Sequence, residues 1–395
     1  MITTFFPPHH FGGDAVAVQN LSLALVRRGH DVTVICDVDA WRALADGPEP
    51  PPAEPVPGLT VHRLRSAAPL LGETLTHQIG RPTLHRRRIE RIVRDGAFDV
   101  LHFHNVSLIG GPGLLGIGDP GPVRLYTAHE HWLVCPTHVL WRYGREPCDA
   151  RDCLRCQIAH RRPPQLWRTT GALEEACRSI DVFLAPSASC AARHAAFGFA
   201  PPMTVLPHGL PDRPAADGAA PHPRPFVLVA GRLEAIKGVE DAIAAVDLVA
   251  GVDLVVAGEG SQGEALRRRA AGRSDVHFRG QVDQQALDHL MRHALAVVAP
   301  SRVEETFGLV VAEAFRAGTP AIARRLGGLA ELVEQADAGF LFDDVPGCAD
   351  AIRALAGDPA LRADLSARAR SAWERHWSDD AVLPRYLAII ERAAS

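Results

Sequence analysis

The sequence lacks several features that would assign it to a class at once. Its 395 residues contain no apolar run of the roughly 18 residues needed to span a bilayer. Its first residues lack the basic segment and the apolar core of a secretory signal peptide. A net charge of −4 gives no excess of positive charge for binding nucleic acid. We therefore expect a cytoplasmic protein without a nucleic-acid partner, whose eight cysteines are thiols or metal ligands rather than disulfides.

The chain also lacks a Gly-x-Gly-x-x-Gly turn after its first expected strand. That turn, followed by an acid about 20 residues later, binds dinucleotides, so its absence disfavours a nicotinamide-dependent oxidoreductase. The same spacing occurs at Gly258, Gly260 and Gly263. A lone match in the second half of the chain predicts only a turn after the strand expected at 252–257.

Apolar, β-type runs alternate with helical patterns along the chain, which is typical of βαβ units and parallel sheets. The first unit has a strand at 1–6, a loop at 7–13 and a helix that begins near Asp14. Further strands are expected at 31–36, 100–103, 123–127, 182–185 and 203–206, and, in the second half, at 226–230, 253–257, 276–278, 296–299 and 320–323.

The chain length suggests two or three domains. Residues 207–225 are rich in proline, alanine, aspartate and glycine, and we interpret them as a linker. It separates an N-terminal domain, 1–206, from a C-terminal domain, 226–376. A last helix is expected at 377–395.

Two loops of the second half carry charges suited to a nucleoside diphosphate. The segment Gly231–Gly238 follows a strand and places Arg232 and Lys237 in one loop, which suits a diphosphate that gains charge as it leaves. The segment Pro300–Glu313 also follows a strand and runs into a helix.

This second loop combines a helix N-terminus with two acids. Phe307, Gly308 and Leu309 fall at the start of the helix, where free amides and the helix dipole attract anions. The carboxylates of Glu305 and Glu313 accept hydrogen bonds from hydroxyls, so the pair suits a sugar and a ribose on either side of a diphosphate.

These segments resemble the signature motifs of the family 4 retaining glycosyltransferases, which have the GT-B fold. Glu305 to Glu313 is similar to the family's Glu-x7-Glu motif, and Gly231 to Gly238 to its Gly-Arg-Leu-x3-Lys-Gly motif. The resemblance covers essentially the whole chain. Three more segments resemble the family in the same order: 12–13, 28–34 and 327–333.

The resemblance implies an α/β protein with two Rossmann-like, doubly wound parallel-sheet domains that face each other across a cleft. The C-terminal helix crosses back to the N-terminal domain. The implied enzyme moves a sugar, with retention of configuration and without a catalytic metal, from a nucleotide-diphosphate donor to an acceptor hydroxyl. A UDP-sugar is favoured and a GDP-sugar is possible. The acceptor is a saccharide, a lipid-linked molecule or a small molecule.

The resemblance also implies roles for individual residues. Arg232 and Lys237 bind the diphosphate and stabilise it as it leaves, while Glu305 faces the transferred sugar and Glu313 holds the ribose. The amides of Phe307, Gly308 and Leu309 lie near sugar and phosphate, and Gly12 and Gly13 let the first loop approach the ligand.

Histidines gather at the ends of two strands of the first half. His102 and His104 lie two positions apart, so their side chains point to the same side of a strand. His129 ends the next strand, and the resemblance places this histidine close to the transferred sugar. His104 and the two neighbours of His129, Glu130 and His131, are expected on the acceptor side.

Four cysteines within 22 residues, Cys135, Cys148, Cys153 and Cys156, have the spacing C-x12-C-x4-C-x2-C. This arrangement predicts a structural zinc site, in which His138 could replace one ligand. An iron–sulfur cluster, disulfides or redox chemistry, and unlinked thiols stay open as alternatives. The cysteine-rich insertion follows His129, so it is expected to shape the acceptor side.

Two basic stretches, 81–94 and 160–168, allow peripheral contact with the inner membrane face, although each could simply be a solvated surface. A catalytically inactive nucleotide-sugar-binding protein is the main alternative to an enzyme. Hydrolysis of the donor distinguishes the two.

Overall fold

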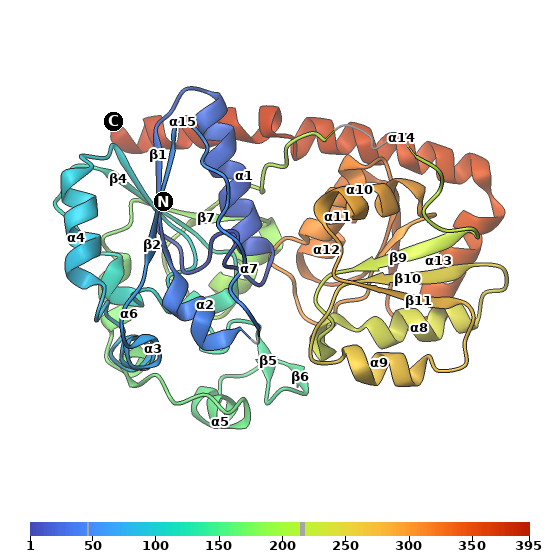
Figure 1. Cartoon of the computed structure of the whole chain (residues 1–395), viewed down its shortest axis with the longest axis horizontal. Coiled ribbons are helices and arrows are strands. Elements are labelled where there is room, and N and C mark those ends of the chain that lie inside the picture. The colour runs from blue at the N-terminus through green and yellow to red at the C-terminus, as the bar shows by residue number, and fades with distance from the viewer. Residues whose placement is uncertain (46, 214–217) are drawn as a thin grey trace. The chain divides into compact units, whose positions relative to one another are not determined.

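The computed structural model describes residues 1–45, 47–213 and 218–395. Residues 214–217 of the expected linker therefore lie outside the described residues. The chain divides into two compact units (Figure 1). The first comprises Met1–Gly209 with Val382–Ser395, and the second comprises Leu210–Ala381.

The first unit is built on a parallel sheet in which β3, β4, β7 and β8 are neighbours in that order. A parallel pair, β1-β2, joins this sheet through Ile2, which bridges to Ile35 and to Phe103. The expected strand 1–6 is thus reduced to isolated bridges. The strands are β1 (Val32–Asp37), β2 (Leu59–Leu64), β3 (Val100–Phe103), β4 (Val123–Thr127), β7 (Val182–Ala185) and β8 (Met203–Val205), with a small antiparallel hairpin of β5 (Trp141–Arg142) and β6 (Glu146–Pro147).

Helices cover both faces of this sheet. They are α1 (Gly13–Arg27), α2 (Val38–Leu44), α3 (Pro69–Ile79), α4 (Arg86–Asp95), α5 (Cys153–Ala159), α6 (Ala172–Cys177), α7 (Ala188–Ala196) and α15 (Asp379–Ala394), with short turns η1 (Pro112–Leu114), η2 (His131–Leu133) and η3 (Leu166–Thr169).

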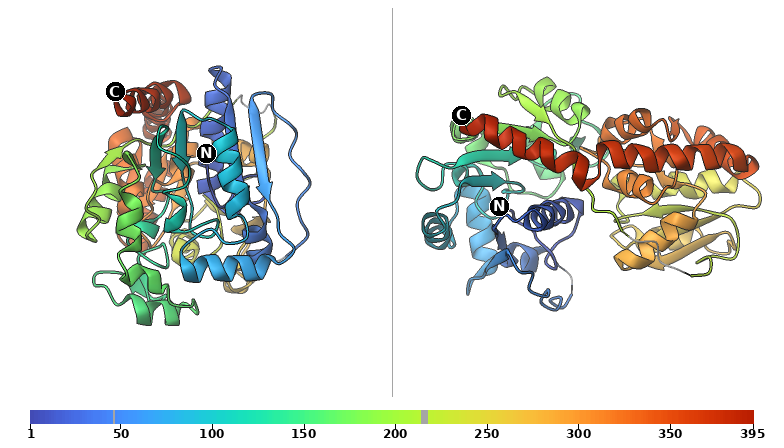
Figure 2. Two further views of the ribbon diagram at one scale, coloured as in Figure 1. Left: turned by 90° about the vertical axis from the view of Figure 1, so that its left-hand side faces the viewer. Right: turned by 90° about the horizontal axis from the view of Figure 1, so that it is seen from above.

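Successive side chains of a strand point to opposite faces of the sheet, so each strand contributes to the apolar layers on both faces. Ile35 packs with Ile89 of α4 on one face, whereas Val34 packs with Val18 of α1 on the other. Leu383 of α15 joins the second cluster, and Figure 2 shows α15, in red, lying along the first unit. The return of the C-terminal helix to the N-terminal domain, which the GT-B resemblance implied, is confirmed.

The second unit has a six-stranded, wholly parallel sheet in the order β11-β10-β9-β12-β13-β14. Its strands are β9 (Phe226–Ala230), β10 (Asp253–Ala257), β11 (Val276–Gly280), β12 (Val297–Ala299), β13 (Ala321–Arg324) and β14 (Gly339–Phe342). Its helices are η4 (Ala235–Lys237), α8 (Val239–Asp247), α9 (Gly263–Arg269), α10 (Gln284–His293), α11 (Leu309–Arg316), α12 (Gly327–Ala336), α13 (Val345–Gly357) and α14 (Pro359–His376).

Both faces of this second sheet are buried, as expected for parallel strands connected by helices. Val227 and Val229 pack under α8, α9 and α13, whereas Phe226 and Leu228 pack against α10 and α11 (Figure 1). This arrangement confirms the doubly wound α/β fold.

The strand order also indicates a candidate place for a ligand. From β9 the chain runs outward to β10 and β11 on one side, and then returns to β12 on the other. In open α/β sheets, ligands bind at the carboxyl ends of the strands next to such a reversal. The loops that follow β9 and β12 are the two charged segments 231–238 and 300–308.

Candidate donor and acceptor sites

The two charged loops of the second unit touch each other. Gly238 has a left-handed backbone with φ of +64°, and any Cβ there would overlap the carbonyl oxygen of Pro300. The amide of Arg302 donates to the carbonyl of Ile236 at 2.8 Å. Glycine at position 238 is therefore required for the loop after β9 to pack on the loop after β12.

An ion pair joins the two loops at their charged ends. Lys237 Nζ lies 2.5 Å from Glu305 Oε1, and the two side chains are partly buried, with 29% and 22% of their surface exposed. Burial alone would raise the pKa of Glu305. The Lys237 ammonium, a hydrogen bond from Ser301 and the Arg232 guanidinium nevertheless hold the pKa of this carboxyl below its ordinary value. Glu305 is thus a carboxylate at neutral pH.

Arg232 is half-exposed and donates to Glu234 at 2.9 Å. It lies in the same loop as Lys237 but is more exposed to solvent. The two cations expected at a diphosphate are therefore brought together, each paired with an acid.

The start of α11 lies next to Glu305. Gly308 precedes the helix with φ of +101°, and a Cβ there would press on Leu329 of α12. Gly328 at the start of α12 donates its amide to the carbonyl of Glu305 at 2.8 Å. Phe307 is buried beneath this loop. The segment 305–309 is thus fixed from below, with the N-terminus of an eight-residue helix beside it.

Glu313 lies on the second turn of α11. Burial raises the pKa of its carboxyl, although the nearby Arg316 and Arg213 oppose the rise. Arg316 is itself committed to an ion pair with Asp288. The Glu313 carboxyl is therefore partly removed from water. Such a carboxyl is suited to accept hydrogen bonds from a ligand.

Lys237 is also distinguished by the composition of the chain. Lysine and arginine together number 42 in the chain, and Lys237 is the only lysine. Arginine thus occupies the other 41 basic positions. An ammonium is compact and bonds from any direction, whereas a guanidinium is a planar fork, so this single exception points to a requirement for the smaller cation.

In the first unit, Gly12 is the extended residue before α1, and Gly13 opens the helix. Asp14, one residue on, accepts a hydrogen bond from Asn105 Nδ2 at 3.1 Å. Because Asn105 follows β3, this contact brings the Gly12-Gly13 loop to the carboxyl edge of the sheet, beside the histidines.

Four histidines form one cluster at this edge. His104 Nδ1 lies 2.9 Å from His129 Nε2, and the rings of His129 and His208 stack at 4.9 Å. The rings of His102 and His104 are 3.9 Å apart, so both point to the same side, as predicted. His208 had no predicted role.

Burial keeps these imidazoles neutral. It lowers the pKa of His129 to about 3, and it lowers the pKa of His102, His104 and His208 well below the ordinary value. A neutral imidazole donates one hydrogen bond and accepts another. The cluster can therefore orient a sugar hydroxyl through hydrogen bonds, but its uncharged imidazoles are poor general acids near neutral pH.

His102 has a structural position within the cluster. Its Nε2 lies 2.8 Å from Thr127 Oγ1, and its Nδ1 lies 3.0 Å from the hydroxyl of Tyr386 in α15. The C-terminal helix thus helps to fix the histidines of the sheet.

The two residues after His129 diverge. Glu130 pairs with His138 Nδ1 at 2.9 Å and remains half-exposed. His131 is buried and packs on His194, with ring centroids 5.2 Å apart. The expected acceptor-side position thus suits Glu130, whereas His131 points into the interior of the unit.

The four clustered cysteines line one small cavity, bounded also by Trp141 and Phe197. All four are free thiols. Within the described residues, three groups of potential ligands have their atoms within 4.8 Å of one another, and the four cysteines are not among them. His138, the possible substitute ligand, is instead paired with Glu130.

A cationic cluster that the sequence did not indicate lies near the first loop. Glu49 accepts hydrogen bonds from His9 at 2.8 Å, from Arg42 at 2.8 Å and from the Arg65 guanidinium. These donors together lower the pKa of Glu49. The four residues come from separate segments, so no local pattern could have predicted the cluster.

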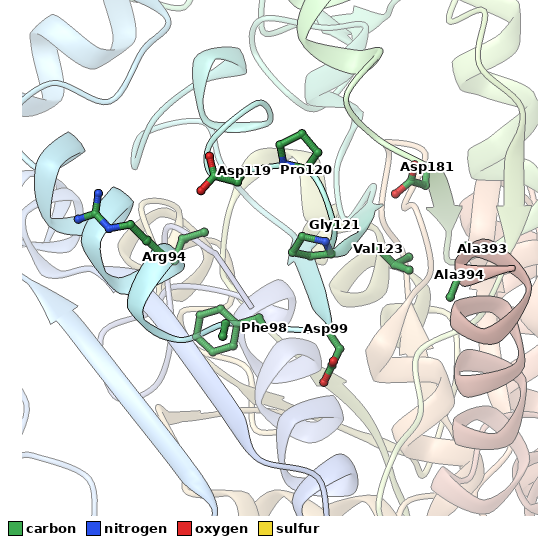
Figure 3. Close-up of a pocket in the computed structure, with 13 residues that line it drawn as sticks. Arg94, Phe98, Asp99, Asp119, Pro120, Gly121, Val123, Asp181, Ala393 and Ala394 are labelled. Atoms are coloured by element: carbon green, nitrogen blue, oxygen red, sulfur yellow. The ribbon is translucent and has the colours of Figure 1, made fainter.

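A surface hollow of the first unit lies at the other edge of the sheet (Figure 3). It is lined by Asp99, Val123 and Asp181, which stand at the amino ends of β3, β4 and β7, and by Ala394 of α15. Because ligands bind at the carboxyl ends of such strands, we do not place the reaction in this hollow. None of the described helices is long and apolar enough to cross a membrane.

Known structures with the same architecture are glycosyltransferases of the GT-B fold. Sucrose-phosphate synthase from Thermosynechococcus elongatus aligns over 100% of this chain and 98% of its own, with a TM-score of 0.75 and 22% identity. An Anabaena protein solved with UDP and glucose aligns over 99% and 98%, with a TM-score of 0.67 and 16% identity.

Family models divide the chain as the structure does. Residues 11–213 match Glycosyltransferase Family 4, and residues 214–372 match Glycosyl transferases group 1. The chain therefore belongs to glycosyltransferase family 4. Glycogen synthase of Mycobacterium tuberculosis is 30% identical over 96% of this chain and 90% of its own length. D-inositol 3-phosphate glycosyltransferase of Xylanimonas cellulosilytica is 30% identical over 94% and 89%.

Proposed function

We propose that the protein transfers a sugar, with retention of configuration and without a catalytic metal, from a UDP-sugar to a hydroxyl of its acceptor. The Lys237–Glu305 pair carries this proposal, because it places an acid and a cation at the strand reversal of the second sheet. A donor would separate the pair. Lys237 would turn to the diphosphate, and Glu305 would accept hydrogen bonds from the sugar hydroxyls.

The remaining donor contacts follow from the same loops. Arg232 would close on the diphosphate from the rim, and the amides of Phe307, Gly308 and Leu309 would meet its oxygens at the start of α11. Glu313, half-buried on that helix, would bind the ribose hydroxyls.

The reaction needs only these groups. The bond between the anomeric carbon and the diphosphate oxygen breaks, and the acceptor oxygen bonds to the same face of that carbon. The acceptor proton passes to the departing diphosphate oxygen. Lys237 and Arg232 stabilise the charge that develops there, and this is the term that most often dominates such catalysis. Neutral His129, supported by His104, would hold a hydroxyl of the transferred sugar.

UDP is favoured over GDP by the Anabaena protein of the same fold, whose structures contain UDP, UDP with glucose, and UDP-glucose. A GDP-sugar donor has support too. A GDP-mannose-dependent mannosyltransferase of Mycobacterium tuberculosis is 36% identical over 37% of this chain.

For the acceptor, we propose a saccharide or a phosphorylated small molecule. The relatives are named for glycogen and for inositol 3-phosphate. The anion-binding set of His9, Arg42 and Arg65 favours an acceptor with a negative group that displaces Glu49. A lipid-linked acceptor is the alternative, since a phosphatidyl-myo-inositol mannosyltransferase of Mycolicibacterium smegmatis is 35% identical over 42% of this chain.

Incubation of the purified protein with UDP-, GDP- and ADP-sugars tests this function. We expect one donor to be consumed, and its sugar to appear on a glucan or an inositol phosphate with unchanged anomeric configuration by NMR. The rate should be the same with and without added Mg²⁺ or Mn²⁺. An inverted product would overturn the retaining mechanism. Tight UDP binding with neither transfer nor hydrolysis would instead support an inactive binding protein.

A further inference from the structure

We propose that Cys135, Cys148, Cys153 and Cys156 bind one Zn²⁺ ion, which holds residues 135–156 of the first unit in their fold. This site is structural and takes no part in sugar transfer. The proposal therefore does not depend on the function proposed above.

The four thiols come to one cavity from three different places. Cys135 follows the η2 turn, Cys148 follows the hairpin β5-β6, and Cys153 and Cys156 lie three positions apart on α5. Residues three apart share a helix face, so the last two thiols point the same way. Convergence of all four over a loop of 22 residues is unexpected unless a common partner binds them.

The insertion has little apolar material to hold it. Its hydrophobic cluster contains only Val134, Cys135, Leu140 and Phe197 as buried members. On α5, Leu154 and Ile158 are 55% and 62% exposed. Figure 1 shows β5, β6 and α5 at the lower rim of the first unit, away from the strands of its sheet.

Secondary structure cannot replace the missing core. The strands β5 and β6 have two residues each, and an isolated two-stranded hairpin is marginally stable at best. Small motifs of this kind depend on a crosslink or a metal.

The backbone of the insertion also has unfavourable conformations. His138, Leu140 and Tyr143 have positive φ angles of 74°, 49° and 53°, although none of them is glycine. Each such residue costs free energy and persists only where its surroundings impose it. These backbone conformations would be imposed if the four cysteine side chains had to point at one metal ion.

One hydrogen bond already fits a metal thiolate. The amide of Tyr143, in the turn of the hairpin, donates to Cys156 Sγ at 3.4 Å. Hydrogen bonds from backbone amides to ligand sulfurs orient metal-bound thiolates and stabilise their charge.

The four cysteine ligands suit zinc. Four thiolates surround Zn²⁺ tetrahedrally with Zn–S distances of about 2.3 Å. The C-x12-C-x4-C-x2-C spacing matches none of the usual iron–sulfur arrangements. On binding, each thiol forms a bond to zinc and loses its proton to water, so the four sulfurs would move inward from their present separations.

A neighbouring group provides an internal comparison. His131, Cys190 and His194 have ligand atoms within 4.8 Å of one another. There, all three residues are buried, His194 Nδ1 lies 2.8 Å from the Cys190 carbonyl, and the rings of His131 and His194 pack with centroids 5.2 Å apart. These contacts account for the group as part of the interior, so we expect it to bind no metal.

Metal analysis of the purified protein tests the proposal. We expect one zinc per chain by mass spectrometry, released when an organomercurial reagent titrates the thiols. The double variant Cys153→Ser/Cys156→Ser should lose it, whereas Cys190→Ala should keep it. Replacement by Co²⁺ should give the intense thiolate-to-metal absorption of a tetrahedral cobalt site.

A second measurement covers the case in which the double variant fails to fold. Wild-type protein stripped of metal should be cleaved by protease within 135–156, and re-addition of zinc should restore its resistance. Thermal stabilisation by UDP, followed in parallel, reports the donor site separately. Wild-type protein without zinc, a disulfide among the four cysteines, iron with acid-labile sulfide, or zinc lost in Cys190→Ala would each overturn the proposal.

Discussion

The candidate donor side of the second unit and the histidine side of the first unit are built in different ways. The groups proposed to bind the donor come from two loops that pack on each other through glycines, and Lys237 and Glu305 are paired across them. The histidines come from the ends of two strands and from Pro207-His208-Gly209, and α15 supports them through Tyr386. The first side is charged and depends on local motifs, whereas the second is neutral and depends on burial.

The largest effect should come from Lys237→Ala. Loss of a group that stabilises a departing anion typically lowers kcat by about 100- to 1,000-fold. Lys237→Arg should restore little of it, because a guanidinium cannot replace an ammonium in this tight contact. Steady-state transfer rates check this, and the thermal shift by UDP should fall in parallel. A nearly normal rate in Lys237→Arg would remove the argument from the single lysine.

The same residue allows a chemical test. Lys237 is the only lysine, and the amino group of Met1 is largely enclosed. An amine-reactive reagent should therefore modify the folded protein mainly at Lys237, with loss of activity, and UDP should protect it. Peptide mass spectrometry locates the label. Inactivation that UDP does not slow would place Lys237 outside the donor site.

Glu313→Gln should weaken donor binding by roughly 10- to 150-fold, since one charge-assisted hydrogen bond contributes roughly 1.5–3 kcal/mol and each 1.4 kcal/mol is tenfold. Glu334→Gln, on an exposed position of the neighbouring helix α12, is the matched control and should leave binding unchanged. Titration calorimetry with UDP measures both. Equal affinities for the two variants would show that Glu313 does not hold the ribose.

His129→Phe should lower the transfer rate and also make the fold less sensitive to acid. The pKa of His129 is about 3 in the folded protein, below the ordinary value of 6.5. The unfolded chain therefore binds a proton that the folded protein does not between these values, and stability falls as the pH falls from about 6.5. For one such group the slope is at most about 1.4 kcal/mol per pH unit. Urea unfolding at pH 7 and pH 5 checks this, with His30→Phe, at an exposed turn, as the control.

Tyr386→Phe should have the smallest effect. It removes only the hydroxyl near His102 and should cost about 0.5–1.5 kcal/mol of unfolding free energy. The apolar ring remains, so the helix should stay packed. A full loss of transfer activity at unchanged stability would contradict this expectation. It would show that the reaction needs the hydrogen bond between Tyr386 and His102.

The structure of α4 disfavours the contact with membranes that its basic sequence suggested. Ile89 and Val93, the apolar side that the basic stretch 81–94 offered, pack into the core of the first unit. Only the arginine face is left, and charge alone binds weakly at physiological salt. We expect slight flotation with anionic liposomes at low salt, and none at physiological salt.

Secondary structure was predictable where strands are buried on both faces. Phe226–Ala230 and Val123–Thr127 are apolar runs between turns, and the structure has both as strands. The strand β2 (Leu59–Leu64) was missed, because its exposed edge position leaves Leu64 as its one fully buried residue. In the second unit, β14 (Gly339–Phe342), an edge strand of the sheet, was missed as well.

The sequence by itself determined which residues form the candidate donor site, since Arg232, Lys237, Glu305 and Glu313 lie in two short motifs whose local structure is strand, loop and helix. Only the tertiary structure decided which histidines meet, that His131 turns inward, and that Glu49 occupies a cationic cluster. The physical reason is the range of the interactions. Turn geometry and helix N-termini are encoded within about ten residues, whereas burial, pKa shifts and contacts between distant segments exist only after the chain has packed.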